Sequence, residues 1–86
     1  MIYTVELENR ARRDLLSLQK DVQGRVVDAL ESLQKEPRPP GAKRLVAKAG
    51  YRIRIGAYRV LYTVEERPPR VLVYRIGHRR EVYRGL

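Results

Sequence analysis

The fold is decided by residues 51–62, which read YRIRIGAYRVLY. Apolar or aromatic residues alternate with arginine over 51–55, which is the period of a half-buried strand. Gly56 and Ala57 then form a two-residue connection with glycine first, which suits a type II′ turn. We expect the partner strand over residues 58–64, so this stretch is predicted to be an antiparallel β-hairpin.

The two-residue turn also determines which side chains lie opposite each other. One face of the hairpin, which must be the buried one, then carries Tyr51, Ile53, Ile55, Tyr58, Val60 and Tyr62. On the other face, Arg54 lies opposite Arg59 and Arg52 lies opposite Leu61. Like charges directly opposite each other destabilise a sheet by about 0.2–1 kcal/mol, and a bound anion would reverse this repulsion. The pattern favours an anion-binding cluster of three arginines; the alternative is a solvated face.

Two helices are predicted between an N-terminal strand and the hairpin. The strand is expected over residues 2–7, because apolar and polar residues alternate there. The first helix is expected from an N-cap at Asn9 to about Leu18, and the second from an N-cap at Asp21 to about Glu36. A proline-rich stretch then ends the second helix. Both helices have an apolar stripe, so they are predicted to form a helical hairpin that packs on the sheet.

The C-terminal part continues the strand pattern. A turn is expected over residues 65–69, followed by a nearly apolar central strand over 71–76, which Gly77 is expected to end. A basic tail over residues 78–84 follows. The order predicts one α+β domain over residues 1–86, in which a three- to four-stranded antiparallel sheet is backed on one face by the helical hairpin.

The charge of the chain is strongly asymmetric. The net charge is +9, and 15 of the 19 cations are arginine. Residues 1–36 carry a net charge of −1, whereas residues 37–86 carry +10. Such a basic half indicates a polyanionic partner, and nucleic acid comes first because arginine forks match phosphate oxygens. An anionic membrane surface fits less well, because the basic half lacks an amphipathic helical pattern. The remaining alternative is an arginine-rich surface that reflects coding bias or thermal adaptation.

Several function classes are excluded by composition. The absence of cysteine excludes disulfides, iron–sulfur clusters, thiolate zinc sites and a cysteine nucleophile, and favours a reducing, cytoplasmic setting. We expect no membrane span and no signal peptide, because no apolar run approaches the required length. One histidine, no carboxylate pair and no metal-ligand spacing predict that the protein uses no metal and no cofactor.

Five motifs spread over nearly the whole chain carry a resemblance to a known family. They are ARRDL at 11–15, KDV at 20–22, PRPPGAKRL at 37–45, YRIRIGAYRVLY at 51–62 and GHRREVY at 77–83. Together they resemble the RelE/ParE superfamily of toxins from type II toxin–antitoxin systems. The motifs are fairly specific for the superfamily and less decisive between its branches. The resemblance implies a RelE-like fold with the order β-α-α-β-β-β.

The resemblance to the RelE branch implies an activity. Toxins of that branch cleave mRNA in the ribosomal A site: the 2′-hydroxyl attacks the adjacent phosphate and leaves a 2′,3′-cyclic product. The chain is therefore expected to be a ribosome-dependent endoribonuclease that inhibits translation in the cytoplasm. Its expected partners are the ribosome, mRNA and an acidic RelB-like antitoxin.

The same resemblance implies roles for individual residues. Arg59 and Arg79 would stabilise the charge that develops on the phosphate, and Arg79 would also protonate the leaving oxygen. Tyr83 would orient or activate the 2′-hydroxyl, and Arg54 would assist the chemistry. The residues expected to bind RNA are Arg52, Arg54, Arg75, His78, Arg80 and Arg84.

One departure from the family leaves the reaction open. Its best-studied members have lysine where this chain has Arg52 and Arg54, and arginine cannot act as a base because it is not deprotonated at ordinary pH. The base is then Tyr83, His78, a ribosomal RNA group or water, or catalysis rests on electrostatic stabilisation alone. Two alternatives follow: a ParE-like DNA gyrase poison, which the complete arginine and tyrosine set argues against, and a non-catalytic RNA-binding module.

Overall fold

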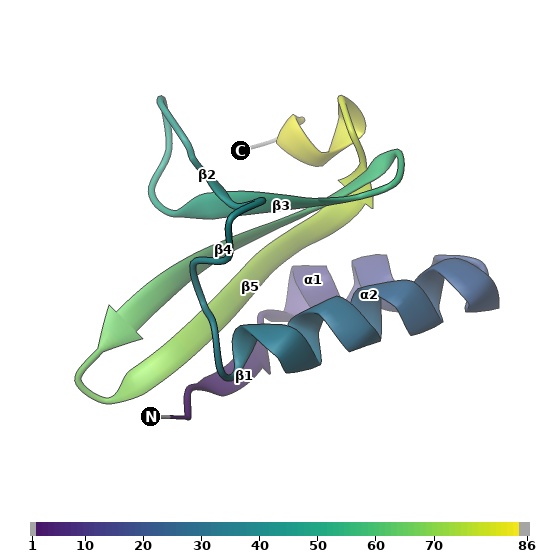
Figure 1. Cartoon of the computed structure of the whole chain (residues 1–86). Coiled ribbons are helices and arrows are strands. Elements are labelled where there is room, and N and C mark those ends of the chain that lie inside the picture. Colours follow the sequence, from purple (N-terminus) through teal and green to yellow (C-terminus); the bar gives the residue numbers. More distant parts are fainter. Residues whose placement is uncertain (1, 85–86) are drawn as a thin grey trace.

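Two helices lie together on one face of a five-stranded sheet (Figure 1). This computed structural model describes residues 2–84. Along the chain the elements are β1 (Thr4–Leu7), α1 (Asn9–Leu16), α2 (Lys20–Leu33), β2 (Lys43–Arg44), β3 (Tyr51–Ile55), β4 (Tyr58–Glu66), β5 (Pro69–His78) and the 3₁₀ helix η1 (Glu81–Tyr83). The predicted α+β class and the order of strand, helix, helix and strands are confirmed.

The sheet is mixed, with the strand order β1-β5-β4-β3-β2. Strands β3 to β5 are antiparallel, as predicted, and the two-residue strand β2, which was not predicted, pairs antiparallel with β3. The first strand adds a parallel edge to β5, with Thr4 opposite Arg70 and Leu7 opposite Val73. A parallel partner requires a long connection, and the chain between β1 and β5 contains both helices and the strands β2 to β4.

The register predicted for the β3–β4 hairpin is confirmed. Ile55 lies opposite Tyr58, Arg54 opposite Arg59, and Arg52 opposite Leu61. Gly56 has a φ of +60°, whereas the second turn residue does not have a positive φ, which is the pattern of a type II′ turn. A two-residue turn of this type fixes a single register between the two strands. The apolar and aromatic residues of the alternating pattern therefore lie on one face of the hairpin, and the arginines lie on the other.

The core lies between the helices and the inner face of the sheet. Its buried members are Tyr3, Ala11, Val22, Val26, Leu30, Leu33, Ile53, Ile55, Val60, Tyr62, Val71, Val73 and Ile76. The predicted inner face of the hairpin and the apolar stripe of the second helix both contribute. Tyr62 is fully buried and donates its hydroxyl hydrogen to the carbonyl oxygen of Pro37 at 2.7 Å. Burial, together with nearby Tyr51, raises the pKa of Tyr62 to about 12.

Both helices begin one or two residues earlier than predicted and end earlier. Glu8 and Gln19 have extended backbone and occupy the N-cap positions, without a side-chain capping bond. Asn9 is therefore the first helical residue, and Asp21 lies in the first turn of α2, where a carboxylate interacts favourably with the helix dipole. α1 ends at Leu16 and α2 at Leu33, before Leu18 and Glu36. The backbone bonds after these ends, from Leu18 to Leu15 and from Lys35 to Ser32, span three residues, so the last turns tighten before the chain leaves the helix.

Gly77 does not end the last strand, which was predicted to stop at residue 76. β5 continues to His78, which lies opposite Tyr58 of β4. A Cβ placed at Gly77 would lie 3.8 Å from the Cβ of Val82, so the bare backbone of Gly77 is covered by the returning tail. Neither helix within residues 2–84 has the length and hydropathy needed to cross a membrane.

Candidate nucleic-acid interface

The outer face of the hairpin, turned away from the helices, carries the predicted arginines. Arg54 is exposed, while Arg52 and Arg59 are partly buried. Arg54 and Arg59 lie directly opposite each other, and Gly77 lies opposite Arg59 on the neighbouring strand β5. The charges of Arg52, Arg54 and Arg79 all act on Arg59. We call these four residues the arginine cluster.

Arg59 is the centre of the cluster and is incompletely bonded. Its Nε is buried and has no hydrogen-bond partner within the part of the chain that the structure describes. Burial lowers the pKa of Arg59; nearby Tyr83 opposes this effect, while the charges of Arg54, Arg52 and Arg79 add to it. A buried donor without an acceptor is costly, and an oxyanion would supply both the acceptor and the opposing charge.

The tail reaches the arginine cluster by folding back over the outer face. Figure 1 shows η1, in yellow, on the opposite side of the sheet from α1 and α2. The backbone N–H of Arg79 donates to the carbonyl oxygen of Ala57 in the hairpin turn at 2.9 Å, and Val82 is fully buried. These attachments bring Arg79 and Tyr83 to Arg59. Four of the predicted residues, Arg54, Arg59, Arg79 and Tyr83, therefore lie together with Arg52.

The other four predicted residues lie outside the arginine cluster. His78 is exposed and lies opposite Tyr58, with the two rings edge to face at 5.6 Å. Because side chains alternate along a strand, His78 is on the face opposite to that of Arg59. Arg75 is only 7% exposed, and its guanidinium is bound within the protein. Arg80 and Arg84 are exposed on the tail beyond the cluster.

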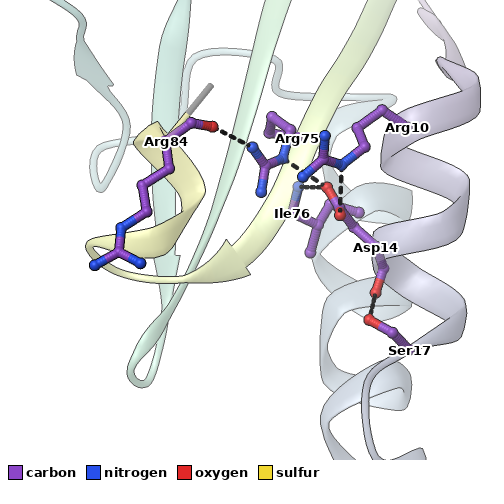
Figure 2. A network of polar contacts seen from close by, with 6 residues as sticks. All are labelled: Arg10, Asp14, Ser17, Arg75, Ile76 and Arg84. Atoms are coloured by element: carbon purple, nitrogen blue, oxygen red, sulfur yellow. Dashed lines mark hydrogen bonds and ion pairs between the residues drawn. The ribbon is translucent and has the colours of Figure 1, made fainter. Parts of the chain in front are cut away.

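A partly buried network around Asp14 was missed by reasoning from the sequence (Figure 2). The Nε of Arg75 donates to Asp14 Oδ2 at 2.9 Å, and the backbone N–H of Ile76 donates to the same oxygen at 2.9 Å. Arg10 contacts the other carboxylate oxygen at 3.3 Å, and Arg75 Nη1 donates to the carbonyl oxygen of Arg84 at 2.9 Å. The only signal in the sequence was one acidic residue in a basic helix, and nothing local indicated its partner.

Two arginines at the other end of the sheet are paired, whereas Arg67, in the β4–β5 turn itself, is exposed and forms no ion pair within residues 2–84. Arg38 Nη2 lies 2.8 Å from a carboxylate oxygen of Glu66, and Arg70 lies 2.9 Å from Glu65. The hydroxyl of Tyr3 donates to Glu66 at 2.6 Å. This bond, together with Arg38, lowers the pKa of Glu66 below its ordinary value.

A pocket of about 480 Å³ lies beside the arginine cluster. It is lined by Ala29, Ser32, Leu33, Pro39, Gly41, Lys43, Arg52, Ile53 and Arg54. Its floor is mainly apolar and three of its residues are cationic. Strand β2 pairs only with Tyr51 and Arg52, so among residues 2–84 the edge of β3 from Ile53 to Ile55 has no strand neighbour on this side.

Comparisons with known proteins agree on one kind of protein. The family described as ParE toxin of type II toxin-antitoxin system, parDE, matches residues 5–83. The chain is 36% identical over 86 residues to Toxin RelG of Mycobacterium tuberculosis. This alignment covers 98% of the chain and 99% of the relative.

Two solved structures share the fold over almost their whole length. The toxin–antitoxin complex RelBE2 from Mycobacterium tuberculosis has a chain that is 34% identical, with a TM-score of 0.79 over 91% of this chain and 99% of that one. The archaeal RelE–RelB complex from Pyrococcus horikoshii has a chain that is 27% identical, with a TM-score of 0.80 over 93% of this chain and 98% of that one.

Proposed function

The chain belongs to the ParE toxin family, within the RelE/ParE superfamily of type II toxin–antitoxin systems, and we propose that it is a ribosome-dependent endoribonuclease that cleaves mRNA in the A site. The observation that carries this proposal is the buried Nε of Arg59, which has no hydrogen-bond partner among residues 2–84 and lies among three further arginines and a tyrosine. Such a site fits an oxyanion whose charge grows during the reaction.

The proposed reaction is an internal transfer of a phosphate. The 2′-oxygen of one nucleotide forms a bond to the adjacent phosphorus while the bond to the 5′-oxygen of the next nucleotide breaks. The products are a 2′,3′-cyclic phosphate and a 5′-hydroxyl. Arg54 and Arg59 stabilise the extra negative charge on the phosphate oxygens, and Arg79 donates a hydrogen bond to the departing 5′-oxygen. Because arginine is not deprotonated at ordinary pH, the proton that completes the 5′-hydroxyl comes from water.

The proton of the 2′-hydroxyl needs an acceptor. The arginines cannot serve, and His78 lies on the far face of the sheet. The role of base falls to Tyr83, to a group of the ribosome or to water, and Tyr83 in each case orients the 2′-hydroxyl. Replacing Tyr83 by phenylalanine tests the first of these: a change in the pH profile of cleavage indicates that Tyr83 is the base, and an unchanged profile at a lower rate assigns the base to the ribosome or to water.

The test of the activity is a translation extract supplied with a short message and ribosomes. Wild-type protein is expected to cut the message within codons positioned in the A site, and Arg79→Ala is expected to leave it intact. Arg70→Ala is the matched control. Arg70 lies on β5, the strand that leads to Arg79, but it is at the other end of the sheet and is paired with Glu65. A message that stays intact with wild-type protein contradicts the proposal.

We also propose an acidic antitoxin as the neutralising partner. Both solved structures described above are complexes of a toxin with an antitoxin. The net charge of +9 and the cationic residues of the pocket suit an acidic chain, and the free edge of β3 suits an added strand. Arg52 and Arg54 line the pocket and also belong to the arginine cluster, so a bound antitoxin would compete with RNA.

The partner is tested by co-expressing the chain with the acidic protein encoded beside its gene and purifying the pair. Copurification that weakens in the double variant Arg52→Glu, Arg54→Glu supports the assignment. A complex that is unaffected by both charge reversals places the antitoxin elsewhere.

A second candidate function is poisoning of DNA gyrase, because the matching family is described by the ParE name. A supercoiling assay with purified gyrase distinguishes it from the first. Loss of supercoiling with no cleavage of message supports the gyrase target, whereas binding of RNA without either effect indicates a non-catalytic RNA-binding module.

A further inference from the structure

The tail that carries Tyr83 is attached to the protein before Tyr83, through Arg79 and the buried Val82, but it has few hydrogen bonds within itself. η1 has three residues, and the backbone bonds that close it and the turn after it, from Tyr83 to Arg80 and from Arg84 to Glu81, measure 3.3 and 3.1 Å. A single 3₁₀ turn has little stability by itself. Its position therefore depends on contacts with the rest of the protein.

Arg75 provides the attachment that follows Tyr83. Its side chain is 8% exposed and makes two contacts at once, with Asp14 of α1 through Nε and with the carbonyl oxygen of Arg84 through Nη1, both at 2.9 Å (Figure 2). The side chain of Asp14 is 12% exposed, and its Oδ2 also accepts the backbone N–H of Ile76. The carboxylate therefore holds the guanidinium in one orientation, with the free end of the fork directed to the tail.

Resting on the function proposed above, we propose that Asp14 and Arg75 are positioning residues that hold Tyr83 over the arginine cluster. Asp14 orients Arg75, and Arg75 anchors the backbone immediately after Tyr83. Neither residue touches the reacting phosphate in this arrangement. Arg75 cannot be replaced by lysine without loss, because one ammonium group does not reproduce two donors that diverge from a planar fork.

The attachment is tested first without any assay of activity. Trypsin cleaves after Arg79 and Arg80 when the tail is released, and mass spectrometry measures cleavage at each site. Arg75→Lys is expected to raise cleavage after Arg80 by about tenfold or more, as the loss of one hydrogen bond from a charged donor predicts. Cleavage after Arg25, in α2, reports unfolding of the whole chain and is expected to change much less.

Two further variants test whether release of the tail is specific to the contact between Asp14 and Arg75. Asp14→Asn keeps the size of the side chain and removes the charge that orients Arg75, so it is expected to release the tail as well. Arg70→Lys changes an arginine of the same strand whose partners are Glu65 and Glu6, and it is expected to leave cleavage after Arg80 unchanged. If cleavage after Arg25 rises as much as cleavage after Arg80, or if Arg75→Lys leaves both unchanged, the positioning role is overturned.

The second test uses the cleavage of message. Arg75→Lys is expected to lower kcat by about tenfold to a hundredfold with little change in KM, because a misplaced group slows the chemical step more than it weakens binding. In this background Tyr83→Phe is expected to cost much less than in the wild type, whereas additive losses contradict the proposal. If wild-type protein cleaves no message, the proposed function fails, and the trypsin result still decides the attachment.

Discussion

The antiparallel sheet holds two groups of arginines in opposite electrostatic situations: Arg38 and Arg70 at one end, and the arginine cluster at the other. Near the β4–β5 turn, Arg38 and Arg70 each lie within 3 Å of a glutamate. Near the Gly56 turn, the four members of the arginine cluster have no ion pair within residues 2–84, and Arg59 even lacks a partner for a buried nitrogen. Burial is not the cause of this difference, because Arg75 is the most buried arginine and has a carboxylate partner.

The comparison teaches that the unpaired arginines contribute little to the fold. Exposed ion pairs contribute about 0–1 kcal/mol, and opposed like charges in a sheet cost a similar amount. Neither end therefore decides whether the chain folds. The arrangement at the Gly56 end becomes favourable only when an anion binds, so its cost to the free protein is consistent with a binding site.

The largest difference between the two ends of the sheet is expected in the rate of message cleavage by Arg59→Ala. Removing one donor to a developing oxyanion lowers the rate by about 100- to 1,000-fold, whereas the melting temperature should stay the same or rise because repulsion is relieved. The matched variant Arg38→Ala, at the paired end, should retain cleavage. Rates from the ribosome-supplemented extract and melting curves check both expectations. Equal losses of cleavage in the two variants would contradict the distinction between the arginine cluster and the paired arginines.

An intermediate effect is expected in the salt dependence of binding to a short single-stranded RNA. Each phosphate contact with single-stranded nucleic acid adds about 0.7 to the slope of log K against log salt concentration. Arg54→Gln should reduce the slope by about that amount. Arg38→Gln should leave the slope unchanged, because Arg38 is bound to Glu66 and Tyr51. RNA titrations at several salt concentrations measure the slope. A reduced slope for Arg38→Gln would contradict the distinction between paired arginines and the arginine cluster.

The smallest effect is expected in the pH dependence of stability at the end of the sheet where Arg38 is paired with Glu66. The hydroxyl of Tyr3, with Arg38, holds the pKa of Glu66 below its ordinary value of 4.5. A group whose pKa is lowered by folding stabilises the protein above its unfolded pKa, and this contribution disappears as the pH falls through the folded pKa. Glu66→Gln should therefore be slightly less stable than wild type at pH 6, and the difference should vanish well below pH 4.5.

Urea unfolding at a series of pH values measures this difference. Arg54→Gln, which changes an arginine with no ion pair in the described chain, should follow the pH dependence of the wild type. A difference between wild type and Glu66→Gln that persists at low pH would show that the pair with Arg38 does not depend on ionisation.

Three members of the arginine cluster, Arg52, Arg54 and Arg59, were predictable because they depend on local rules: the turn at Gly56 determines the register, and the register determines which arginines share a face. Arg79 joins them only because the tail folds back and binds Ala57 of the turn. The place of His78 was not predictable in this way. An expected stop at Gly77 placed His78 in the tail, whereas a strand that continues through Gly77 places it on the face opposite to Arg59.

By itself, the sequence determined the hairpin, its register, the helical stripes and the asymmetry of charge, because each follows from neighbours a few residues apart. Only the tertiary structure decided that β1 pairs in parallel with β5, and that Asp14 binds Arg75 across 61 positions of the chain. Spacing along the chain contains no information about such contacts. The contact with Asp14 arises because the edge of β5 beyond β1 leaves the N–H of Ile76 in need of an acceptor, and packing brings the carboxylate of α1 to that place.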